Sequence, residues 1–317
     1  MGGSPISSSD MRSYYSERRP DIKRASYASQ VFKSVGMLDA FDPSKMKLPR
    51  EACDSALSPR SRGIIIGEDV TGSMGKYLLS LIKDDFPRLM PMIYDSVSYN
   101  PHIMFMGIGD VAAGDRAPLQ VTQFETDLRI LEQFEKIYLE QGGGANPYES
   151  YILPWYFAAK HIKMDCFDKR GEKGFLFTFG DEEPTPRITS SEIQTVFGKN
   201  DTLNVRMLTS EDCLEMASEK FHCYHILLAG NGYSERTVNK WRTLMGSHVC
   251  DLNYNHNYIP ELVTTILKMY EGLSKTEAID KIQSTEARSV VKDALRWHEE
   301  IVTDVPVTSS ESDFDVF

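Results

Sequence analysis

The stretch that most constrains this chain is residues 63–75, which read Gly-Ile-Ile-Ile-Gly-Glu-Asp-Val-Thr-Gly-Ser-Met-Gly. A short run of branched apolar residues between glycines is typical of a strand buried inside a parallel sheet. Asp69, Thr71 and Ser73 occupy alternate positions of the loop that follows, and a helical pattern begins after Gly75. Because open α/β sheets bind ligands at the carboxyl ends of their strands, the stretch predicts a ligand site. Its hard oxygen atoms suit a small divalent cation such as Mg²⁺.

The rest of the chain alternates strand and helix patterns, which favours a doubly wound, Rossmann-like α/β sheet. After the strand at 63–68, strands are expected at 102–108, 119–124, 174–180, 224–229 and 248–252. Helices are expected at 27–35, 73–95, 127–140, 147–163, 235–245 and 259–270. The connection between the strands at 102–108 and 119–124 is too short for a helical crossover. The strand at 119–124 is therefore expected to lie antiparallel at the edge of a mostly parallel sheet.

Charge and composition divide the chain into four parts. Residues 1–62 are basic, with 11 Lys and Arg against 7 Asp and Glu, and are expected to form a loop-rich extension of a body at 63–270. Residues 271–303 open with the capping-box pattern Ser274-Lys-Thr-Glu277 and are expected to form an amphipathic helix. Packing on the body is the preferred interpretation of that helix, and docking on a partner is the alternative. Residues 304–317 form an acidic, Ser-rich tail that is predicted to be disordered.

Four groups of motifs, counting the one already described, appear in order along the body. They are Asp-x-Thr-Gly-Ser-Met at 69–74, Gly-Ile-Gly-Asp followed by Phe-Glu-Thr-Asp at 107–110 and 124–127, Gly-Gly-Gly-Ala-Asn-Pro-Tyr-Glu at 142–149, and Gly-Asp at 180–181. In this order they resemble the intracellular and α-kinase-type von Willebrand factor A (vWA) domains. The resemblance implies the vWA fold over the body and a metal-ion-dependent adhesion site. It implies that Asp69, Thr71, Ser73 and Asp181 hold Mg²⁺, or Mn²⁺ or Ca²⁺, with one position open for a partner's carboxylate.

The loop at 142–149 departs from the family pattern. Ala145 stands where many members have a coordinating Thr, and Asn146 stands where this subgroup has Asp. Asn146 could ligate the metal through its amide oxygen, or it could cap a helix that begins at Pro147. Glu149 could be a polar contact that holds the loop or a contact for a basic partner. Asp110 could be an outer ligand or an ordinary turn carboxylate, and it is grouped with Glu149 and Glu182 as a partner-binding candidate.

The tail supports three interpretations. Asp313 or Asp315 could enter the metal site of the same chain or of a neighbouring copy. The end at Phe317 resembles the acidic, Phe-ended tails of single-stranded-DNA-binding proteins and could dock on a basic pocket of a partner. The third interpretation is a segment that only increases solubility.

These observations predict a non-enzymatic adaptor or assembly subunit in a cytoplasm, which binds an acidic protein partner through a metal ion. The resemblance implies an AAA+ ATPase or a multiprotein complex as partner, and a homo-oligomer remains open. One alternative is a Mg²⁺-dependent hydrolase that uses Asp69 and Asp181. Another is a nucleic-acid-associated scaffold that acts through the basic residues of 1–62. The acidic body argues against nucleic-acid binding elsewhere, and no apolar run is long enough to cross a bilayer.

Overall fold

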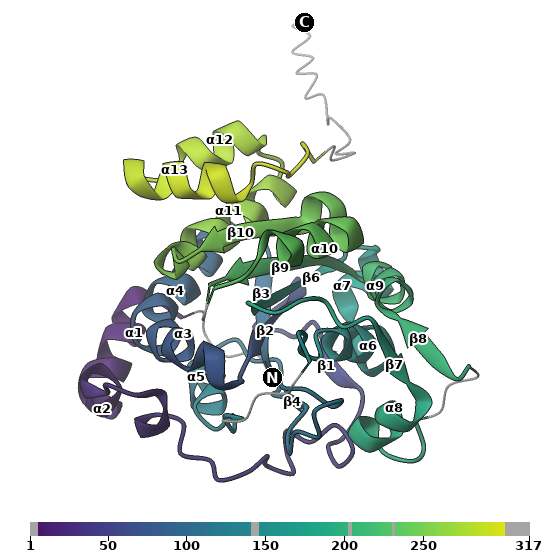
Figure 1. Ribbon diagram of the computed structural model, residues 1–317. Coiled ribbons are helices and arrows are strands. Elements are labelled where there is room, and N and C mark those ends of the chain that lie inside the picture. Colours follow the sequence, from purple (N-terminus) through teal and green to yellow (C-terminus); the bar gives the residue numbers. More distant parts are fainter. Residues whose placement is uncertain (1–5, 141–145, 202–204, 230–231, 302–317) are drawn as a thin grey trace, which may run out of the picture.

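The computed structural model describes residues 6–140, 146–201, 205–229 and 232–301. In these residues a six-stranded sheet forms the centre of the molecule, in the order β10-β9-β6-β2-β3-β4 (Figure 1). Its strands are β2 (Ser61–Asp69), β3 (Asn100–Ile108), β4 (Leu119–Val121), β6 (Gly174–Gly180), β9 (Phe221–Leu228) and β10 (Val249–Asn253). All neighbours are parallel except β3 and β4, which are antiparallel. The predicted fold class, a mostly parallel doubly wound sheet with one antiparallel edge strand, is confirmed.

Successive side chains of β2 point to opposite faces of the sheet and contribute to two apolar layers. Ile64 and Ile66 belong to the core on one face of the sheet, whereas Ile65 belongs to the core on the other face. This follows from the two-residue period of a strand, and burial of both faces explains why β2 is apolar throughout. The first face is covered by α3 (Gly75–Ser80), α4 (Phe86–Ser96), α5 (Arg129–Phe134) and α11 (Ile259–Tyr270). The second is covered by α6 (Ile152–His161), α7 (Asp165–Arg170), α8 (Ser190–Phe197), α9 (Ser210–Ser218) and α10 (Glu235–Met245) (Figure 1).

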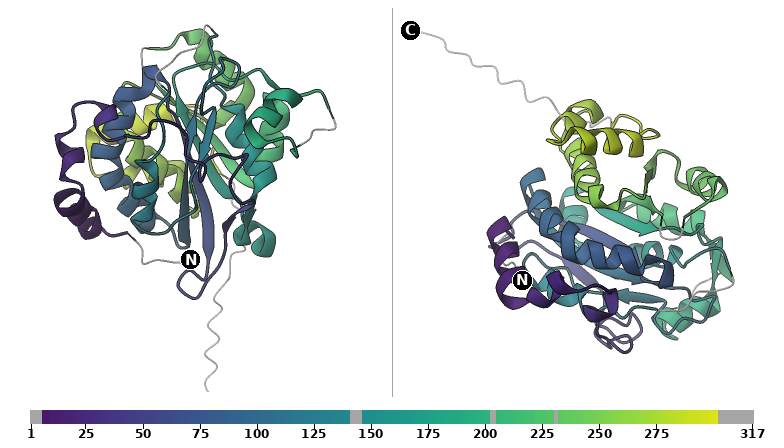
Figure 2. Two further views of the ribbon diagram at one scale, coloured as in Figure 1. Left: turned by 90° about the horizontal axis from the view of Figure 1, so that it is seen from below. Right: turned by 60° about the vertical axis from the view of Figure 1, so that its left-hand side comes forward.

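The N-terminal segment is packed on the body. It forms α1 (Ser8–Ser13), a π-helical turn (Tyr14–Arg18), α2 (Pro20–Arg24) and a 3₁₀ turn (Ala28–Gln30), so the helix predicted at 27–35 is wrong. Met11, Tyr14 and Tyr15 are buried in the core of the first face. Figure 2 shows these purple helices beside the blue helices, and α1 contacts α4 directly. Burial of aromatic rings, which the basic composition did not reveal, holds this segment in place.

Two small sheets were not predicted. β1 (Arg50–Ala52) pairs in parallel with β5 (Ile162–Met164), which ties the end of the N-terminal segment to the second face. β7 (Arg187–Thr189) pairs antiparallel with β8 (Met207–Thr209) and projects from the side of the molecule (Figure 1). Two 3₁₀ turns, Gly246–His248 and His256–Tyr258, flank β10.

Several helix boundaries differ from the predictions. The helix expected at 73–95 is a 3₁₀ turn (Gly72–Met74), α3, a π-helical turn (Leu81–Asp85) and α4 in succession. The helix expected at 127–140 is only α5, and the one expected at 147–163 begins five residues late, at Ile152. Before Ile152 the backbone forms a hydrogen bond to another loop, because the carbonyl of Pro147 accepts from the N–H of Glu183 at 3.0 Å. The segment before α6 is therefore bound to the loop that follows β6 and does not form a helical turn.

The C-terminal segment begins with the predicted capping box, in which Ser274 and Glu277 cap each other's backbone. It forms two helices, α12 (Lys275–Asp280) and α13 (Thr285–Ala294), because Ser284 caps a second helix start. Ile279, Ile282 and Ala294 are buried in the first-face core, in agreement with the packing interpretation. The tail at 304–317 lies outside the described residues. Among the helices of the described part, none has the length and apolarity that a bilayer span requires.

Candidate functional site

Asp69, the last residue of β2, is fully buried and hydrogen-bonded through both oxygens. Its Oδ1 accepts from the N–H of Thr71 at 2.9 Å and from the Thr71 hydroxyl at 2.6 Å. Its Oδ2 accepts from the hydroxyl of Tyr151 at 2.9 Å. An Asp side chain that binds the backbone two residues later makes a local turn, so Asp69 shapes the loop that carries Thr71 and Ser73.

Ser73 reaches across to the neighbouring strand. Its hydroxyl donates to Oδ1 of Asp181 at 3.0 Å, and Asp181 directly follows β6. The strands β2 and β6 are adjacent and parallel, so their carboxyl ends meet at the same edge of the sheet. The structure therefore brings together the four residues that the sequence grouped as metal ligands on these two loops, Asp69, Thr71, Ser73 and Asp181. We call this group the β2–β6 corner.

Tyr151 was missed by the sequence analysis and connects the two loops of the corner. Its hydroxyl binds Asp69, and the same hydroxyl would lie 1.9 Å from a Cβ atom added to Gly180. The ring is fully buried and packs edge-on against His225 and Trp241, with centroids 5.1 and 5.3 Å apart. Only a glycine at position 180 leaves room for this hydroxyl. The one sequence signal was a tyrosine at the start of an apolar helical run, where a polar tip usually finds a partner.

The loop at 146–150 is organised around Asp110 and not around a helix cap. Asn146 donates its amide to Oδ2 of Asp110, while Ser150 donates its hydroxyl to Oδ1 at 3.1 Å. The N–H of Ala112 also donates to Oδ1, at 2.9 Å. Because α6 begins at Ile152, the prediction that Asn146 caps a helix starting at Pro147 is wrong. Ala145 lies outside the described residues.

Buried and half-buried acids surround the corner, and several have raised pKa values. Burial, assisted by the charge of Asp181, raises the pKa of Asp69 to about 7 although Thr71 and Tyr151 bind the carboxylate. Burial, followed by repulsion from Asp69 and Asp110, raises the pKa of Glu149 far above that of an ordinary carboxyl group. Burial and the neighbouring Asp181 also raise the pKa of Glu182. In the described residues, Asp69, Glu149 and Glu182 form no ion pair with Lys, Arg or His.

The atoms of the corner fit an oxygen-coordinated divalent cation. Hydroxyl and carboxylate oxygens are the ligands that Mg²⁺, Mn²⁺ and Ca²⁺ prefer. Oε2 of Glu149, a carboxyl group whose pKa the charge of Asp69 helps to raise, is buried and has no hydrogen-bond partner in the described part of the chain. Across that same part, no group of three or more His, Cys, Asp and Glu side chains is arranged to hold a metal. The fit therefore depends on the hydroxyls of Thr71 and Ser73 together with the carboxylates.

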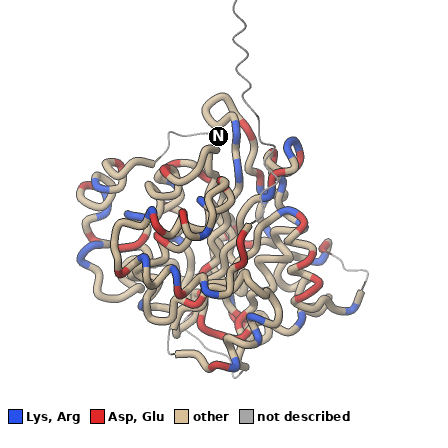
Figure 3. Tube along the Cα trace, turned by 90° about the horizontal axis from the view of Figure 1, so that it is seen from above, with Lys and Arg blue, Asp and Glu red and all other residues tan. Residues whose placement is uncertain are grey.

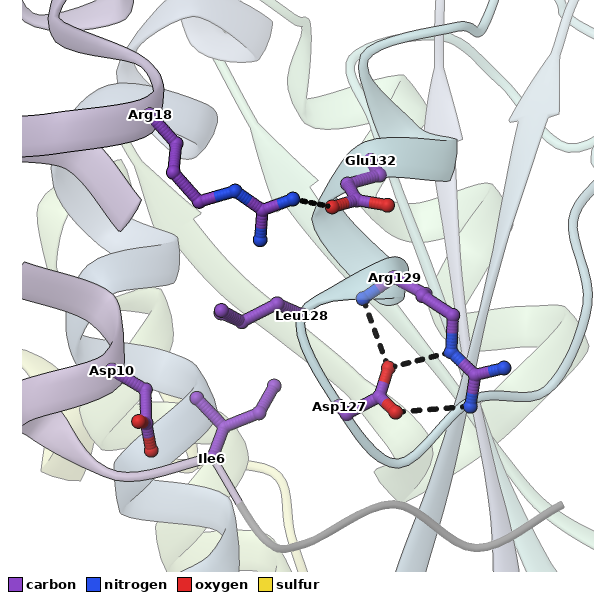
Figure 4. A pocket seen from close by; sticks show the side chains of 7 residues that line it. All are labelled: Ile6, Asp10, Arg18, Asp127, Leu128, Arg129 and Glu132. Carbon is purple, nitrogen blue, oxygen red and sulfur yellow. Dashed lines mark hydrogen bonds and ion pairs between the residues drawn. The ribbon is translucent and has the colours of Figure 1, made fainter. Parts of the chain in front are cut away.

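The basic residues of the N-terminal segment largely face acids of the same chain. Arg18 pairs with Glu132 at 2.6 Å beside a hollow of about 350 Å³, which is also lined by Asp127 and Arg129 (Figure 4). Arg19 pairs with Asp21 at 2.8 Å and with Glu135. Figure 3 shows Lys and Arg interspersed with Asp and Glu along the trace. Part of the basic charge that suggested a nucleic-acid arm is therefore used within the fold.

No family model and no curated protein matches this chain. Among solved structures, it is similar to the pilus adhesin SpaC from Lactobacillus rhamnosus GG in its open conformation, with 9% identity and a TM-score of 0.41 over 76% of this chain. It is also similar to a von Willebrand factor type A protein from Catenulispora acidiphila, with 10% identity and a TM-score of 0.36 over 71% of this chain. The chain spans only 31% and 49% of the lengths of those chains. At these values the similarities assign no role to any residue.

Proposed function

We propose that this protein is a non-enzymatic, metal-dependent protein-interaction module, an adaptor or assembly subunit that acts in a cytoplasm. The observation that carries the proposal is the β2–β6 corner. There, Thr71 and Ser73 hydroxyls lie hydrogen-bonded to Asp69 and Asp181, on two adjacent strand ends, among buried acids. The sequence resemblance to vWA domains agrees with this arrangement.

The chemistry of the corner explains how such a module would bind. Thr71 and Ser73 would offer neutral oxygens to Mg²⁺, while Asp69 and Asp181 would compensate part of its charge. A cation held partly by neutral ligands keeps positive charge facing outward. An Asp or Glu side chain of a partner would then displace a water molecule and complete the octahedral shell. The partner class is therefore a protein with an accessible acidic side chain, such as an AAA+ ATPase or a subunit of a larger complex.

Calorimetric titration of the 317-residue chain with Mg²⁺ tests the metal site. We expect the wild type to bind one Mg²⁺ and the Asp69→Ala variant to lose this binding. Asp168→Ala is the matched control, because Asp168 is an exposed acid in α7. Unchanged Mg²⁺ binding in Asp69→Ala would refute the site.

Pull-downs test partner binding. The partner should be lost when a chelator is added, and it should also be lost with the Asp69→Ala variant. Mg²⁺-dependent turnover of a phosphoester that requires Asp69 would instead support the hydrolase alternative.

A further inference from the structure

A second hollow, of about 590 Å³, lies beside β4 at the edge of the central sheet. Its walls come from the loop at 38–47, from Arg50 at the start of β1, from Gln123 just after β4 and from the end of α5. Its volume falls in the range of about 300–1,000 Å³ that is usual for small-ligand sites. We call it the Arg50 hollow. It shares no residue with the β2–β6 corner.

Arg50 is a buried cation that faces only neutral acceptors. The residue is 4% exposed, and its Nη2 donates to the backbone carbonyls of Ala40 at 2.6 Å and Val121 at 3.4 Å. Its Nε is buried and has no hydrogen-bond partner in the described part of the chain. Burial lowers the pKa of the guanidinium to about 10, which leaves it charged at neutral pH. A buried charge is costly unless an opposite charge compensates it, and carbonyl groups do not provide one.

Two lysines of the same hollow add to this positive charge. Lys47 and Lys136 are exposed and, like Arg50, take part in none of the ion pairs of the described residues. The acid among the described lining residues, Asp39, pairs with Lys45 at 2.7 Å. Most basic residues near the N-terminus face acids of the chain, but these three cations converge on one hollow without such a partner.

The charge of the hollow favours a ligand with two negative charges. A phosphate monoester carries about two negative charges above its second pKa of about 6, and it offers three acceptor oxygens. A guanidinium group binds phosphate oxygens through well-oriented N–H groups, and ammonium groups add charge. The loop at 38–47 also contributes the apolar side chains of Leu38, Phe41 and Met46. An apolar wall suits the organic part of an ester better than it suits a free ion.

We propose that the Arg50 hollow binds a small phosphate monoester. Its phosphoryl group lies at Arg50, Lys47 and Lys136, and its organic part lies against Leu38 and Phe41. The binding adds a second ligand to the module and is independent of the proposed metal site, because the two sites have no residue in common.

Calorimetric titration of the 317-residue chain with phenyl phosphate, without divalent metal ions and at low ionic strength, tests this inference. We expect one binding site. Lys47→Gln and Lys136→Gln should each weaken binding about fivefold, because each removes one exposed charge contact. Lys292→Gln is the matched control and should bind as the wild type does. Lys292 is an exposed lysine of α13, which contacts β10 at the opposite edge of the sheet from β4.

The two lysine variants carry the test, because Arg50 also holds two backbone carbonyls and its substitution would change the fold as well. Inorganic phosphate and benzoate define the chemistry of the ligand. Inorganic phosphate should bind about tenfold more weakly than phenyl phosphate, because it buries no apolar surface. Benzoate should also bind more weakly, because it carries a single negative charge.

Four results would overturn the inference. These are no binding of phenyl phosphate, affinity that is unchanged in both lysine variants, equal affinity for benzoate, and equal affinity for inorganic phosphate. The Asp69→Ala variant separates this site from the proposed metal site. It should bind phenyl phosphate as the wild type does, whatever its affinity for Mg²⁺. Loss of phenyl phosphate binding in Asp69→Ala would place the ligand at the β2–β6 corner and refute the Arg50 hollow as its site.

Discussion

Carboxylates at the amino ends of the central strands (the amino edge) and at their carboxyl ends (the carboxyl edge) have pKa values shifted in opposite directions. At the amino edge, Asp54 is bound by Arg170 at 2.7 Å and by the hydroxyl of Ser61 at 2.7 Å. Burial opposes ionisation there, but these hydrogen bonds outweigh it and hold the pKa of Asp54 far below its usual value. At the carboxyl edge, burial raises the pKa values of Asp69 and Glu149, and neighbouring acids raise them further.

This difference separates the acids that stabilise the fold from the acids that are suited to bind a cation. Where the chain supplies its own cation, as Arg170 and Lys169 do at the amino edge, the acid is part of the scaffold. At the carboxyl edge, hydroxyls of Thr71 and Ser73 bind the carboxylates, and the proposed Mg²⁺ would supply the positive charge there.

The largest expected effect is that of Gly180→Ala at the carboxyl edge. The new methyl group would overlap the Tyr151 hydroxyl, which is held in place by Asp69 and by packed aromatic rings. We expect the free energy of unfolding to fall by about 3 kcal/mol, measured by urea denaturation. Gly75→Ala is the control, since nothing lies within 4 Å of its added Cβ and helix propensity favours alanine there. Equal stability of the two variants would show that Tyr151 can move aside.

Mg²⁺ should stabilise the protein through the carboxyl edge and not through the amino edge. At a Mg²⁺ concentration 100 times the dissociation constant, the wild type should gain about 2.7 kcal/mol of stability, because the cation binds only the folded state. Asp69→Asn should abolish this gain, and Asp168→Asn should retain it. Thermal unfolding with Mg²⁺ and with a chelator measures the difference. A gain that survives Asp69→Asn would place the cation elsewhere.

Asp54→Asn should destabilise the protein equally with and without Mg²⁺. The substitution weakens the pairing of Arg170 and the contact with Ser61, which should cost about 2 kcal/mol. Urea denaturation in both conditions provides the measurement. If the cost depended on Mg²⁺, the two edges would be coupled and the contrast between them would fail.

The pH dependence of stability should have opposite signs at the two edges. A carboxyl group whose pKa is raised on folding, such as Asp69, stabilises the fold fully below about pH 4, and this stabilisation is lost as the pH rises through about 7. The slope is at most about 1.4 kcal/mol per pH unit for one proton. Asp54, whose pKa is lowered, instead loses its contribution as the pH falls below 4. Unfolding measured from pH 4 to 8 without metal should show the first loss, and saturating Mg²⁺ should remove it.

Tyr151→Phe should have the smallest effect. It removes the donor to Oδ2 of Asp69, so stability should fall by about 1 kcal/mol and Mg²⁺ affinity by about tenfold. Tyr156→Phe is the matched control, because it removes the hydroxyl of a tyrosine in α6 that binds Asp201 and not Asp69. Calorimetry should show unchanged Mg²⁺ binding in that control. Equal losses of affinity in both variants would mean that Tyr151 acts only through general stability.

Local sequence signals determined the strands of the central sheet, its antiparallel edge strand and the turn at Asp69. β6, α10 and α11 have the predicted bounds, and Thr71 binds Asp69 because the two residues are neighbours in one turn. The same holds for the capping box at Ser274. These features depend on residues only a few positions apart, so their patterns are visible in the sequence itself.

Only the tertiary structure decided which loops meet. Ser73 reaches Asp181 across 108 positions because β2 lies beside β6, and Tyr151 reaches Asp69 because its helix packs under the same edge. Neighbours far away in sequence also bury Tyr14 and Tyr15. They likewise decide that the Asn146 amide donates its hydrogen bond to Asp110. The roles of the corner residues in metal binding stay predictions. The physical reason is that local patterns encode the direction of the backbone, whereas the partners of a polar side chain depend on which elements pack side by side.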